Sequence, residues 1–225
     1  MNKKTFFITG TDTNSGKTVV SCLIINSIKN FGRKVIGFKP ISSGSFLENG
    51  QIKNRDAQKL KYFSNLKVSN KMMNPYFFIK PTAPHIAAKK QNITIKKKVL
   101  SENFKKLQKI SEYIIIEGAG GWLTPINESQ FLSDWILENK IKIILVVNMK
   151  IGCINHALLT QYAIKNSKGI IFGWVANFKN KMSEKKEYLQ FLSKKICAPL
   201  IGTVKKYKNF QEIEKEENFF SNYIT

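Results

Sequence analysis

The chain has 225 residues, of which 43% are hydrophobic and 12% aromatic, so it is long and apolar enough to bury a core and is unlike a disordered protein. Its apolar runs have the length of strands, and the run behind the basic start ends at Gly10, which argues against a membrane span and a signal peptide. The net charge of +22 comes from 35 Lys and only 2 Arg scattered along the chain, a pattern that favours a solvated surface over a nucleic-acid or membrane partner. We therefore expect one cytoplasmic domain over residues 1–225.

Short β-branched or aromatic runs alternate along the chain with segments of helical periodicity. The predicted strands are residues 5–9, 34–38, 113–117, 142–148, 169–176 and 200–204, and the predicted helices are residues 19–30, 56–63, 97–110, 129–138, 155–165 and 183–196. Several strands are apolar throughout, which is typical of parallel strands covered on both faces. The pattern predicts an α/β fold, a doubly wound and mostly parallel sheet with helices on both faces. Ligands of such sheets bind beyond the carboxyl ends of the strands.

The first of these strand ends carries a P-loop-like segment at residues 10–18, which follows a predicted strand and opens a predicted helix. Backbone N–H groups around Gly16 are expected to bind phosphates, with Lys17 at the β- and γ-phosphates and the Thr18 hydroxyl on Mg²⁺. Five residues separate Gly10 from Gly16, and Thr11 stands where a glycine is usual. The segment predicts ATP or GTP binding; the alternative is an ordinary strand–helix turn with a chance Gly-Lys-Thr.

Three charged residues near other strand ends are candidates for the same site. Glu117 ends a predicted strand before a glycine-rich turn at residues 118–121, and a carboxylate there can bind Mg²⁺. Asp56 opens a predicted helix, so it is equally explained as a charge that favours the helix dipole. Lys39 follows the second predicted strand and is a candidate phosphate ligand, although taken alone it reads as a surface lysine.

Together these segments resemble the dethiobiotin synthetase family. The matching stretches are residues 7–13, 16–18, 39–44, 81–85, 117–122, 152–157 and 173–177, in the order and spacing of the family over about residues 5–202. The resemblance implies a P-loop NTPase-type fold and an ATP-dependent cyclo-ligase of biotin biosynthesis. Such an enzyme carboxylates 7,8-diaminononanoate with CO₂ or bicarbonate and closes the ring to dethiobiotin, with ADP and phosphate as the other products. The implied intermediates are a carbamate and a carbamic–phosphoric anhydride.

The resemblance also implies roles for individual residues. Lys17 and Lys39 are the catalytic cations, and Thr18, Asp56 and Glu117 bind Mg²⁺. The expected ATP-binding residues are Asn14, Ser15, Gly16, Lys17, Thr18, Val19, Asp56, Glu117, Gly118, Ala119, Gly120, Asn177, Phe178, Lys205, Lys206, Tyr207 and Glu212. The expected substrate-binding residues are Thr13, Ser43 and Tyr188 and, from the other subunit of a homodimer, Ile151, Gly152, Cys153 and Asn155.

Two positions depart from the family pattern. Lys205 stands where the family usually carries a proline, which weakens the prediction of the adenine pocket after Gly202, and Ser15 stands where family members tend to have an apolar residue.

Asn177 is expected to contact adenine, because its amide can donate to and accept from one base edge. By itself, an asparagine at the end of a strand is more simply a turn former.

The main alternative function is that of a partition-type ATPase, which the basic charge would suit. Those proteins usually carry a lysine near the first glycines of the loop, whereas residues 8–11 here are Ile-Thr-Gly-Thr. The segment 207–222 has mixed charge and is not a basic amphipathic membrane helix. A second alternative is an amide-forming ligase that acts on a large acid such as a corrin, but such enzymes commonly carry a glutaminase domain for which the chain has no room.

Overall fold

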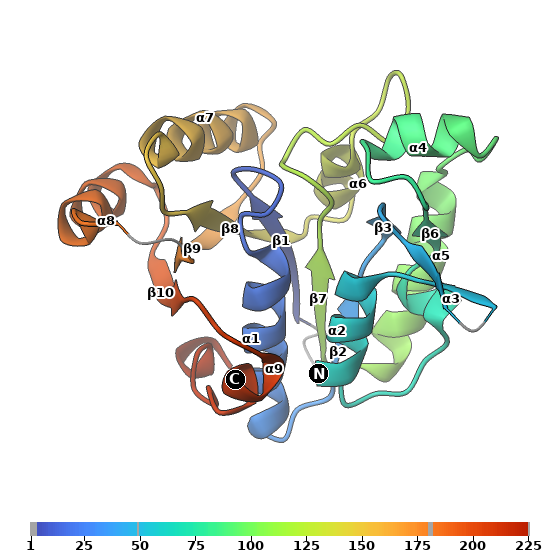
Figure 1. Cartoon of the computed structure of the whole chain (residues 1–225), viewed down its shortest axis with the longest axis horizontal. Helices are drawn as coiled ribbons and strands as arrows, with labels where there is room; N and C mark the ends of the chain where they lie inside the picture. The colour runs from blue at the N-terminus through green and yellow to red at the C-terminus, as the bar shows by residue number, and fades with distance from the viewer. Residues whose placement is uncertain (1–3, 49, 180–181, 225) are drawn as a thin grey trace.

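A six-stranded parallel sheet forms the centre of the computed structural model, which describes residues 4–48, 50–179 and 182–224 (Figure 1). Its order is β10-β9-β8-β1-β7-β2. The strands are β1 (Lys4–Gly10), β2 (Val35–Phe38), β7 (Tyr113–Glu117), β8 (Lys142–Asn148), β9 (Ile171–Phe178) and β10 (Leu200–Lys205). All of the predicted strands occur in this sheet, and the predicted α/β class is confirmed.

Two sets of helices cover the faces of the sheet (Figure 1). On one face lie α1 (Lys17–Asn30), α2 (Arg55–Phe63) and α9 (Phe210–Glu214). On the other lie α5 (Lys97–Ile110), α6 (Leu132–Glu138), α7 (Cys153–Asn166) and α8 (Lys185–Lys195). β1 is central, with β7 on one side and β8 on the other, so the loop that follows β1 lies at the point where the chain direction across the sheet reverses.

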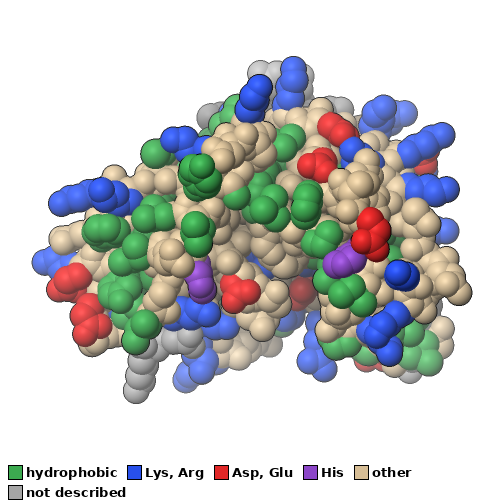
Figure 2. Space-filling view, turned by 90° about the horizontal axis from the view of Figure 1, so that it is seen from above, with side chains coloured by type: hydrophobic (Ala, Val, Ile, Leu, Met, Phe, Trp, Pro, Cys, Tyr) green, Lys and Arg blue, Asp and Glu red, His purple; other side chains and the backbone are tan. Residues whose placement is uncertain are grey.

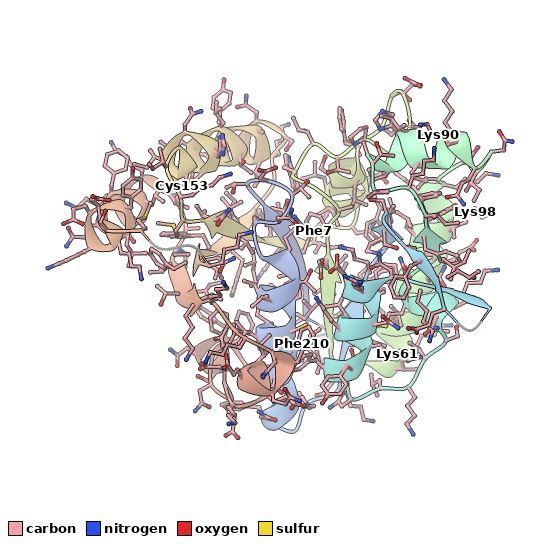
Figure 3. The ribbon with its side chains drawn as sticks, in the orientation of Figure 1. Phe7, Lys61, Lys90, Lys98, Cys153 and Phe210 are labelled. Atoms are coloured by element: carbon pink, nitrogen blue, oxygen red, sulfur yellow. The ribbon has the colours of Figure 1, made fainter. Side chains whose placement is uncertain are left out.

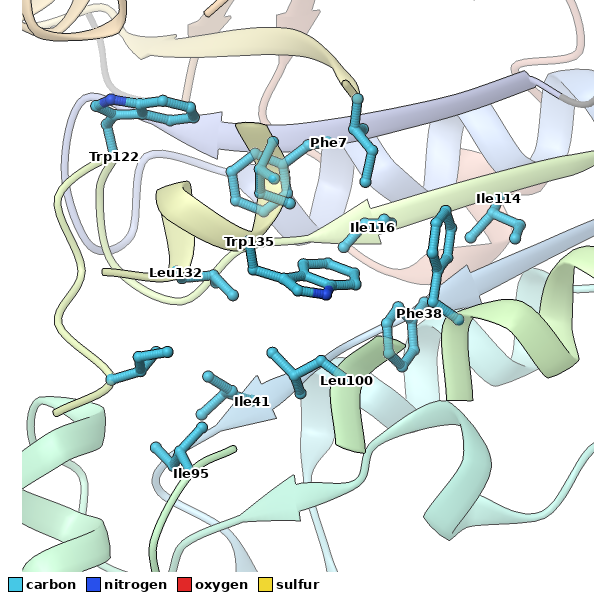
Figure 4. Packing of buried hydrophobic residues seen from close by; sticks show 14 of the residues in the cluster. Phe7, Phe38, Ile41, Ile95, Leu100, Ile114, Ile116, Trp122, Leu132 and Trp135 are labelled. Atoms are coloured by element: carbon cyan, nitrogen blue, oxygen red, sulfur yellow. The ribbon is translucent and has the colours of Figure 1, made fainter. Parts of the chain in front are cut away.

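Successive residues of the central strands enter different cores, which explains why these strands are apolar throughout. Phe7 packs with α5 and α6, as Figure 4 shows, while the neighbouring Phe6 and Ile8 pack with α1. In β7, Ile114 and Ile116 join the first core. Side chains of a strand alternate between its faces, so a strand with helices on both sides has no polar face.

The region between β2 and α5 contains elements that the sequence analysis did not predict. They are β3 (Ile41–Ser42), β4 (Phe46–Glu48), β5 (Gln51–Lys53), α3 (Asn70–Met73), β6 (Tyr76–Phe77) and α4 (Pro84–Lys90), and near the end of the chain α9 and a 3₁₀ turn (Ser221–Tyr223) were also missed. Most are two to five residues long, too short to show a hydrophobic period. No helix of the described residues has the length and apolarity needed to cross a membrane.

Candidate active site

The loop after β1 has the backbone shape of a phosphate-binding loop. Gly16 has φ of +101° and Asn14 has φ of +60°, and α1 begins at the next residue, Lys17. Three side chains brace the loop: Asn177 Nδ2 donates to the Ser15 carbonyl at 2.8 Å, Lys179 Nζ donates to the Asn14 carbonyl at 3.0 Å, and Lys17 Nζ donates to the Asp12 carbonyl at 3.0 Å. The N-terminus of α1 therefore faces a preformed loop suited to an anion.

Gly16→Ala is expected to damage the loop much more than a comparable change elsewhere. A Cβ at Gly16 would lie 1.9 Å from Asn177 Nδ2, in addition to the strain of a left-handed conformation. We expect turnover to fall about a hundredfold, because a shift of roughly 1 Å in an active site costs that much. The control is Gly32→Ala, since Gly32 has φ of +72° with nothing within 4 Å of the added Cβ. Turnover, nucleotide affinity and melting temperature of both variants measure the difference, and equal effects would contradict the prediction.

Beside the loop, a buried lysine joins two carboxylates. Lys39 Nζ lies 2.6 Å from Glu117 Oε1 and 3.6 Å from Asp56 Oδ2, and it also donates to the Gly118 carbonyl at 3.0 Å. The side chains of Lys39 and Glu117 are 4% and 1% exposed. Thr18 Oγ1 donates to Glu117 Oε1 at 2.9 Å, which connects α1 to the end of β7. Residues far apart in the chain, from α1, the loop after β2, α2 and β7, thus meet at one strand-end edge.

Burial and these charges shift the pKa values of the site. Burial, with repulsion from Lys39, lowers the pKa of Lys17 to about 8. Burial also disfavours the charged form of Lys39, but attraction to Glu117 and Asp56 outweighs it and raises the pKa of Lys39. Burial alone would raise the pKa of Asp56, whereas Lys39 and the Thr18 hydroxyl lower it. A phosphate beside Lys17 would stabilise its charged form.

The oxygen atoms of this cluster fit a hard divalent cation. Oε2 of Glu117 is buried and has no hydrogen-bond partner among the described residues, and the Thr18 hydroxyl and the Asp56 carboxylate lie close by. No group of three or more His, Cys, Asp or Glu side chains in the described part of the chain could hold a metal ion. A site with only two carboxylates and a hydroxyl suits a metal that keeps waters and binds nucleotide phosphates, as Mg²⁺ does.

A cavity of about 1050 Å³ collects most of the predicted site residues. The expected residues that line it are Thr13, Asn14, Gly16, Lys17, Thr18, Val19, Lys39, Ser43, Asp56, Glu117, Gly118, Ala119, Gly120, Asn177, Lys205, Lys206 and Tyr207. Lys39 and Glu117 come from the side of β1 that carries β7 and β2, and Asn177 and Lys205 come from the side that carries β8, β9 and β10. The P-loop, the carboxylates of Asp56 on α2 and Glu117 in β7, and residues 205–207 therefore enclose one space.

The other predicted residues do not line this cavity. Ser15 is buried, Phe178 ends β9, and Glu212 accepts a hydrogen bond from the Lys208 N–H at 2.9 Å in the turn before α9. The residues expected from a second subunit lie around the start of α7, where Ile151 is 88% exposed. In that region Gly152 caps α7, Asn155 is exposed on it, and Cys153 and Tyr188 pack with the core beneath α7 and α8.

Several cavity residues were missed by the sequence analysis. Lys59 follows Asp56 by three residues on α2, so helical spacing could have found it, and its ammonium group lies 4.9 Å from the centre of the Phe210 ring. Helical spacing could not have predicted Lys179. It follows β9, and it reaches the Asn14 carbonyl of the P-loop because of the order of the strands in the sheet. The remaining unpredicted lining residues are Ser42, Pro81, Thr82, Ala83, Pro84, Leu123, Thr124 and Pro125.

Solved structures share the fold. The septum site-determining protein MinD of Pyrococcus horikoshii, complexed with Mg-ADP, superposes with a TM-score of 0.55 at 16% identity over 96% of this chain and 86% of that chain. A ParA family ATPase of Chlorobium tepidum does so with a TM-score of 0.54 at 15% identity over 98% and 92%. A family model described as an AAA domain matches residues 4–213. Fold and loop together define a P-loop NTPase domain.

Curated relatives identify the family within this class. The ATP-dependent dethiobiotin synthetase BioD of Wigglesworthia glossinidia brevipalpis is 45% identical over 215 residues, 93% of this chain and 95% of that protein. The ATP-dependent dethiobiotin synthetase BioD 1 of Escherichia coli K12 is 38% identical over 202 residues, 89% of this chain and 90% of that protein. The chain belongs to the ATP-dependent dethiobiotin synthetase family.

Proposed function

We propose that this protein converts 7,8-diaminononanoate, CO₂ and ATP into dethiobiotin, ADP and phosphate. The observation that carries the proposal is the single cavity in which Lys17, Lys39 and Thr18 face Asp56 and Glu117 beside Ser43. Phosphoryl transfer requires positioning and neutralisation of charge rather than a protein nucleophile. Two buried lysines beside a phosphate-binding loop supply both.

The proposed reaction balances without any further reactant. One amine adds to CO₂ and loses a proton to give a carbamate, whose oxygen attacks the γ-phosphorus of ATP and displaces ADP. The second amine then attacks the carbamoyl carbon of the mixed anhydride, loses a proton and expels phosphate, which closes the cyclic urea. Lys17 and Lys39 are proposed to neutralise the equatorial oxygens during the transfer. Thr13 and Ser43, which line the same cavity, are proposed to orient the diamine and its carbamate.

Mg²⁺ is proposed to be held by Thr18, Asp56 and Glu117, because these oxygen donors suit it. When bound, it would neutralise charge on the β- and γ-phosphates of ATP. The unpartnered Oε2 of Glu117 supports this assignment. Lys39 Nζ pairs with the same two carboxylates, Glu117 and Asp56.

Asn177 is proposed to favour adenine through the oxygen of its carboxamide group. One N–H of its Nδ2 donates to the Ser15 carbonyl, which fixes the orientation of the carboxamide and leaves Oδ1 as its acceptor for a base. A carbonyl oxygen accepts a hydrogen bond from the 6-amino group of adenine, whereas the O6 atom of guanine would repel it. Lys205, Lys206 and Tyr207 line the cavity on the same side and are proposed to enclose the base.

A homodimer with a shared substrate site is also part of the proposal. Ile151, Leu159 and Tyr162 are 88%, 59% and 66% exposed, and the last two lie one turn apart on α7. Figure 2 looks onto the end of the molecule that carries α7 and α4 and shows hydrophobic side chains gathered there. Exposed apolar side chains gathered on one face support an association site there. A second copy on α7 would bring the segment 151–155 to the diamine of its partner.

Leu159→Glu is expected to weaken this dimer and, with it, turnover. Burying a carboxylate in an apolar contact is unfavourable, and loss of a central contact of about 2 kcal/mol raises the dimer dissociation constant roughly thirtyfold. The matched control is Leu47→Glu, a leucine of β4 that is 70% exposed. Light scattering and turnover are measured over a range of protein concentrations. A monomeric variant with the turnover of the parent protein would contradict a shared site.

The activity test uses purified protein with Mg-ATP and bicarbonate. Phosphate release is measured with and without 7,8-diaminononanoate, and dethiobiotin is sought by mass spectrometry. Release that depends on the diamine and matches the dethiobiotin formed would support the function. ATP hydrolysis that ignores the diamine would instead favour an ATPase switch, and salt-sensitive, ATP-dependent DNA binding would then distinguish a partition protein.

Residues 1–225 are further proposed to act as one domain in the cytoplasm, where ATP is available. The C-terminal segment supports the first point, because it docks on α1 rather than forming a separate unit. Asn26 Nδ2 donates to the carbonyls of Ile213, Glu214 and Glu216 at 3.3, 3.0 and 3.4 Å. Phe220 N–H donates to Ser27 Oγ at 3.1 Å.

A further inference from the structure

A second cavity, of about 450 Å³, lies between β5, α2, α3 and β6. No residue lines both this cavity and the active-site cavity. Its volume is within the range of small-molecule sites. The apolar part of its lining comes from Ile52, Ala57, Met73 and Phe77. It is therefore large enough for a small organic molecule and can accept an aliphatic body.

The charged part of the lining has one sign. Two lysines and no aspartate or glutamate line the cavity. Lys53 is neutralised by Glu48, whose Oε2 lies 2.7 Å from its Nζ. Lys61, labelled in Figure 3 on α2, donates to Asn70 Oδ1 at 2.8 Å and forms no ion pair with a carboxylate of the described residues. An anionic group placed against Lys61 would gain a charge-assisted hydrogen bond.

The wall of this cavity also supports the active site. Asn54 and Asn74, both buried, line the cavity. Asn54 Nδ2 donates to the Ser43 carbonyl at 3.3 Å, and its Oδ1 caps α2 by accepting from the N–H groups of Asp56 and Ala57. Asn74 Nδ2 donates to the Lys39 carbonyl at 2.7 Å. The two carboxamides thus connect the cavity to the backbone of the loop 39–43 and to the helix that carries Asp56.

We propose that this cavity is a regulatory site for a small monocarboxylate with an aliphatic chain. The carboxylate binds Lys61 and the chain lies on Ala57, Met73 and Phe77. Binding of the carboxylate displaces the side chains of Asn54 and Asn74 or restricts their motion. The backbone of the loop 39–43, to which both side chains donate hydrogen bonds, then changes its arrangement, and the affinity of the active site for the diamine changes with it. A ligand changes an equilibrium in this way only when it binds the two loop arrangements with different affinities. Binding of the carboxylate does not depend on the proposed function, whereas its effect on the affinity for the diamine rests on that function.

Binding is tested by calorimetry with octanoate and, as the uncharged probe, octanamide. We expect octanamide to bind about two- to fivefold more weakly, because Lys61 is exposed and an exposed ion pair contributes little. Lys61→Gln should weaken octanoate binding to the same extent, and Ala57→Met should block it by filling the cavity. The control is Lys71→Gln, an exposed lysine of α3 that does not line the cavity. Absence of octanoate binding, or equal affinity in Lys61→Gln and the parent protein, overturns the proposal.

The regulatory part is tested by steady-state kinetics. Saturating octanoate should change the KM for the diamine in the parent protein and in Lys71→Gln but not in Lys61→Gln. An unchanged KM in the parent protein overturns the regulatory role, as does simple competition with the diamine that Lys61→Gln leaves intact. Dethiobiotin is a further probe. If Lys61→Gln weakens dethiobiotin binding as it weakens octanoate binding, the natural ligand of the cavity is the product of the proposed reaction. Because calorimetry requires no turnover, failure of the proposed function and failure of this site are distinguishable.

Discussion

Replacing Lys39 with methionine is expected to lower turnover by two to three orders of magnitude, roughly, while nucleotide still binds. The ammonium group of Lys39 is buried between Glu117 and Asp56 at the wall of the active-site cavity, so it can neutralise charge where the γ-phosphoryl group would be transferred. Loss of one preorganised electrostatic group costs about a hundred- to a thousandfold in rate. Nucleotide binding depends mainly on the backbone of the P-loop and on Lys17, which Lys39→Met leaves in place. Phosphate release and calorimetry with ADP measure the two effects separately.

Stability is the main complication of this variant. Lys39→Met leaves Glu117 buried without its cationic partner, which costs about 3–5 kcal/mol in comparable buried pairs. The double variant Lys39→Met/Glu117→Gln removes both charges and should recover much of the lost unfolding free energy. We expect its turnover to remain low, because the cation is still absent. Turnover at the parental rate in a folded Lys39→Met protein would remove Lys39 from the mechanism.

The sheet could be predicted because hydrophobic pattern and burial agree along each strand. Residues 113–117 and 142–148 match β7 and β8, and the helix at residues 97–110 matches α5. In α5, Leu100, Phe104 and Leu107 form a buried stripe opposite the lysines. The P-loop could be predicted because it depends on local sequence between a strand and a helix.

Other parts of the site depend on contacts that the sequence does not specify locally. Lys39 reads as a surface lysine in sequence, yet it is 4% exposed, because Glu117 and Asp56 reach it from two other elements. Lys179 contacts the P-loop only because β9 lies beyond β8 in the sheet. Ser42 of β3 and Pro84 of α4 line the active-site cavity. These elements have two and seven residues, too few for a clear periodic signal. The proposed substrate rests on the family resemblance and not on hydrophobic pattern.

The identity of the metal ligands is the second prediction with a large expected effect. Glu117→Gln keeps the shape of the side chain but removes its charge, and Asp56→Asn does the same on α2. If both carboxylates share one Mg²⁺, each variant should need at least about ten times more Mg²⁺ for half-maximal activity, which is the usual cost of losing even an outer-shell partner of a metal. Mn²⁺ binding in the presence of ADP, followed by electron paramagnetic resonance, gives a readout that does not require turnover.

Glu112→Gln is the matched control, because Glu112 directly precedes β7 and lies at the opposite end of the strand from Glu117. It contacts the Lys34 N–H and Arg33 and is remote from the P-loop. Its Mg²⁺ requirement should equal that of the parent protein. A normal requirement in both Asp56→Asn and Glu117→Gln would exclude the shared metal. A raised requirement in Glu117→Gln alone would leave the buried, unpartnered Oε2 as the protein ligand, and Asp56, whose side chain is 40% exposed, would then serve mainly to hold Lys39.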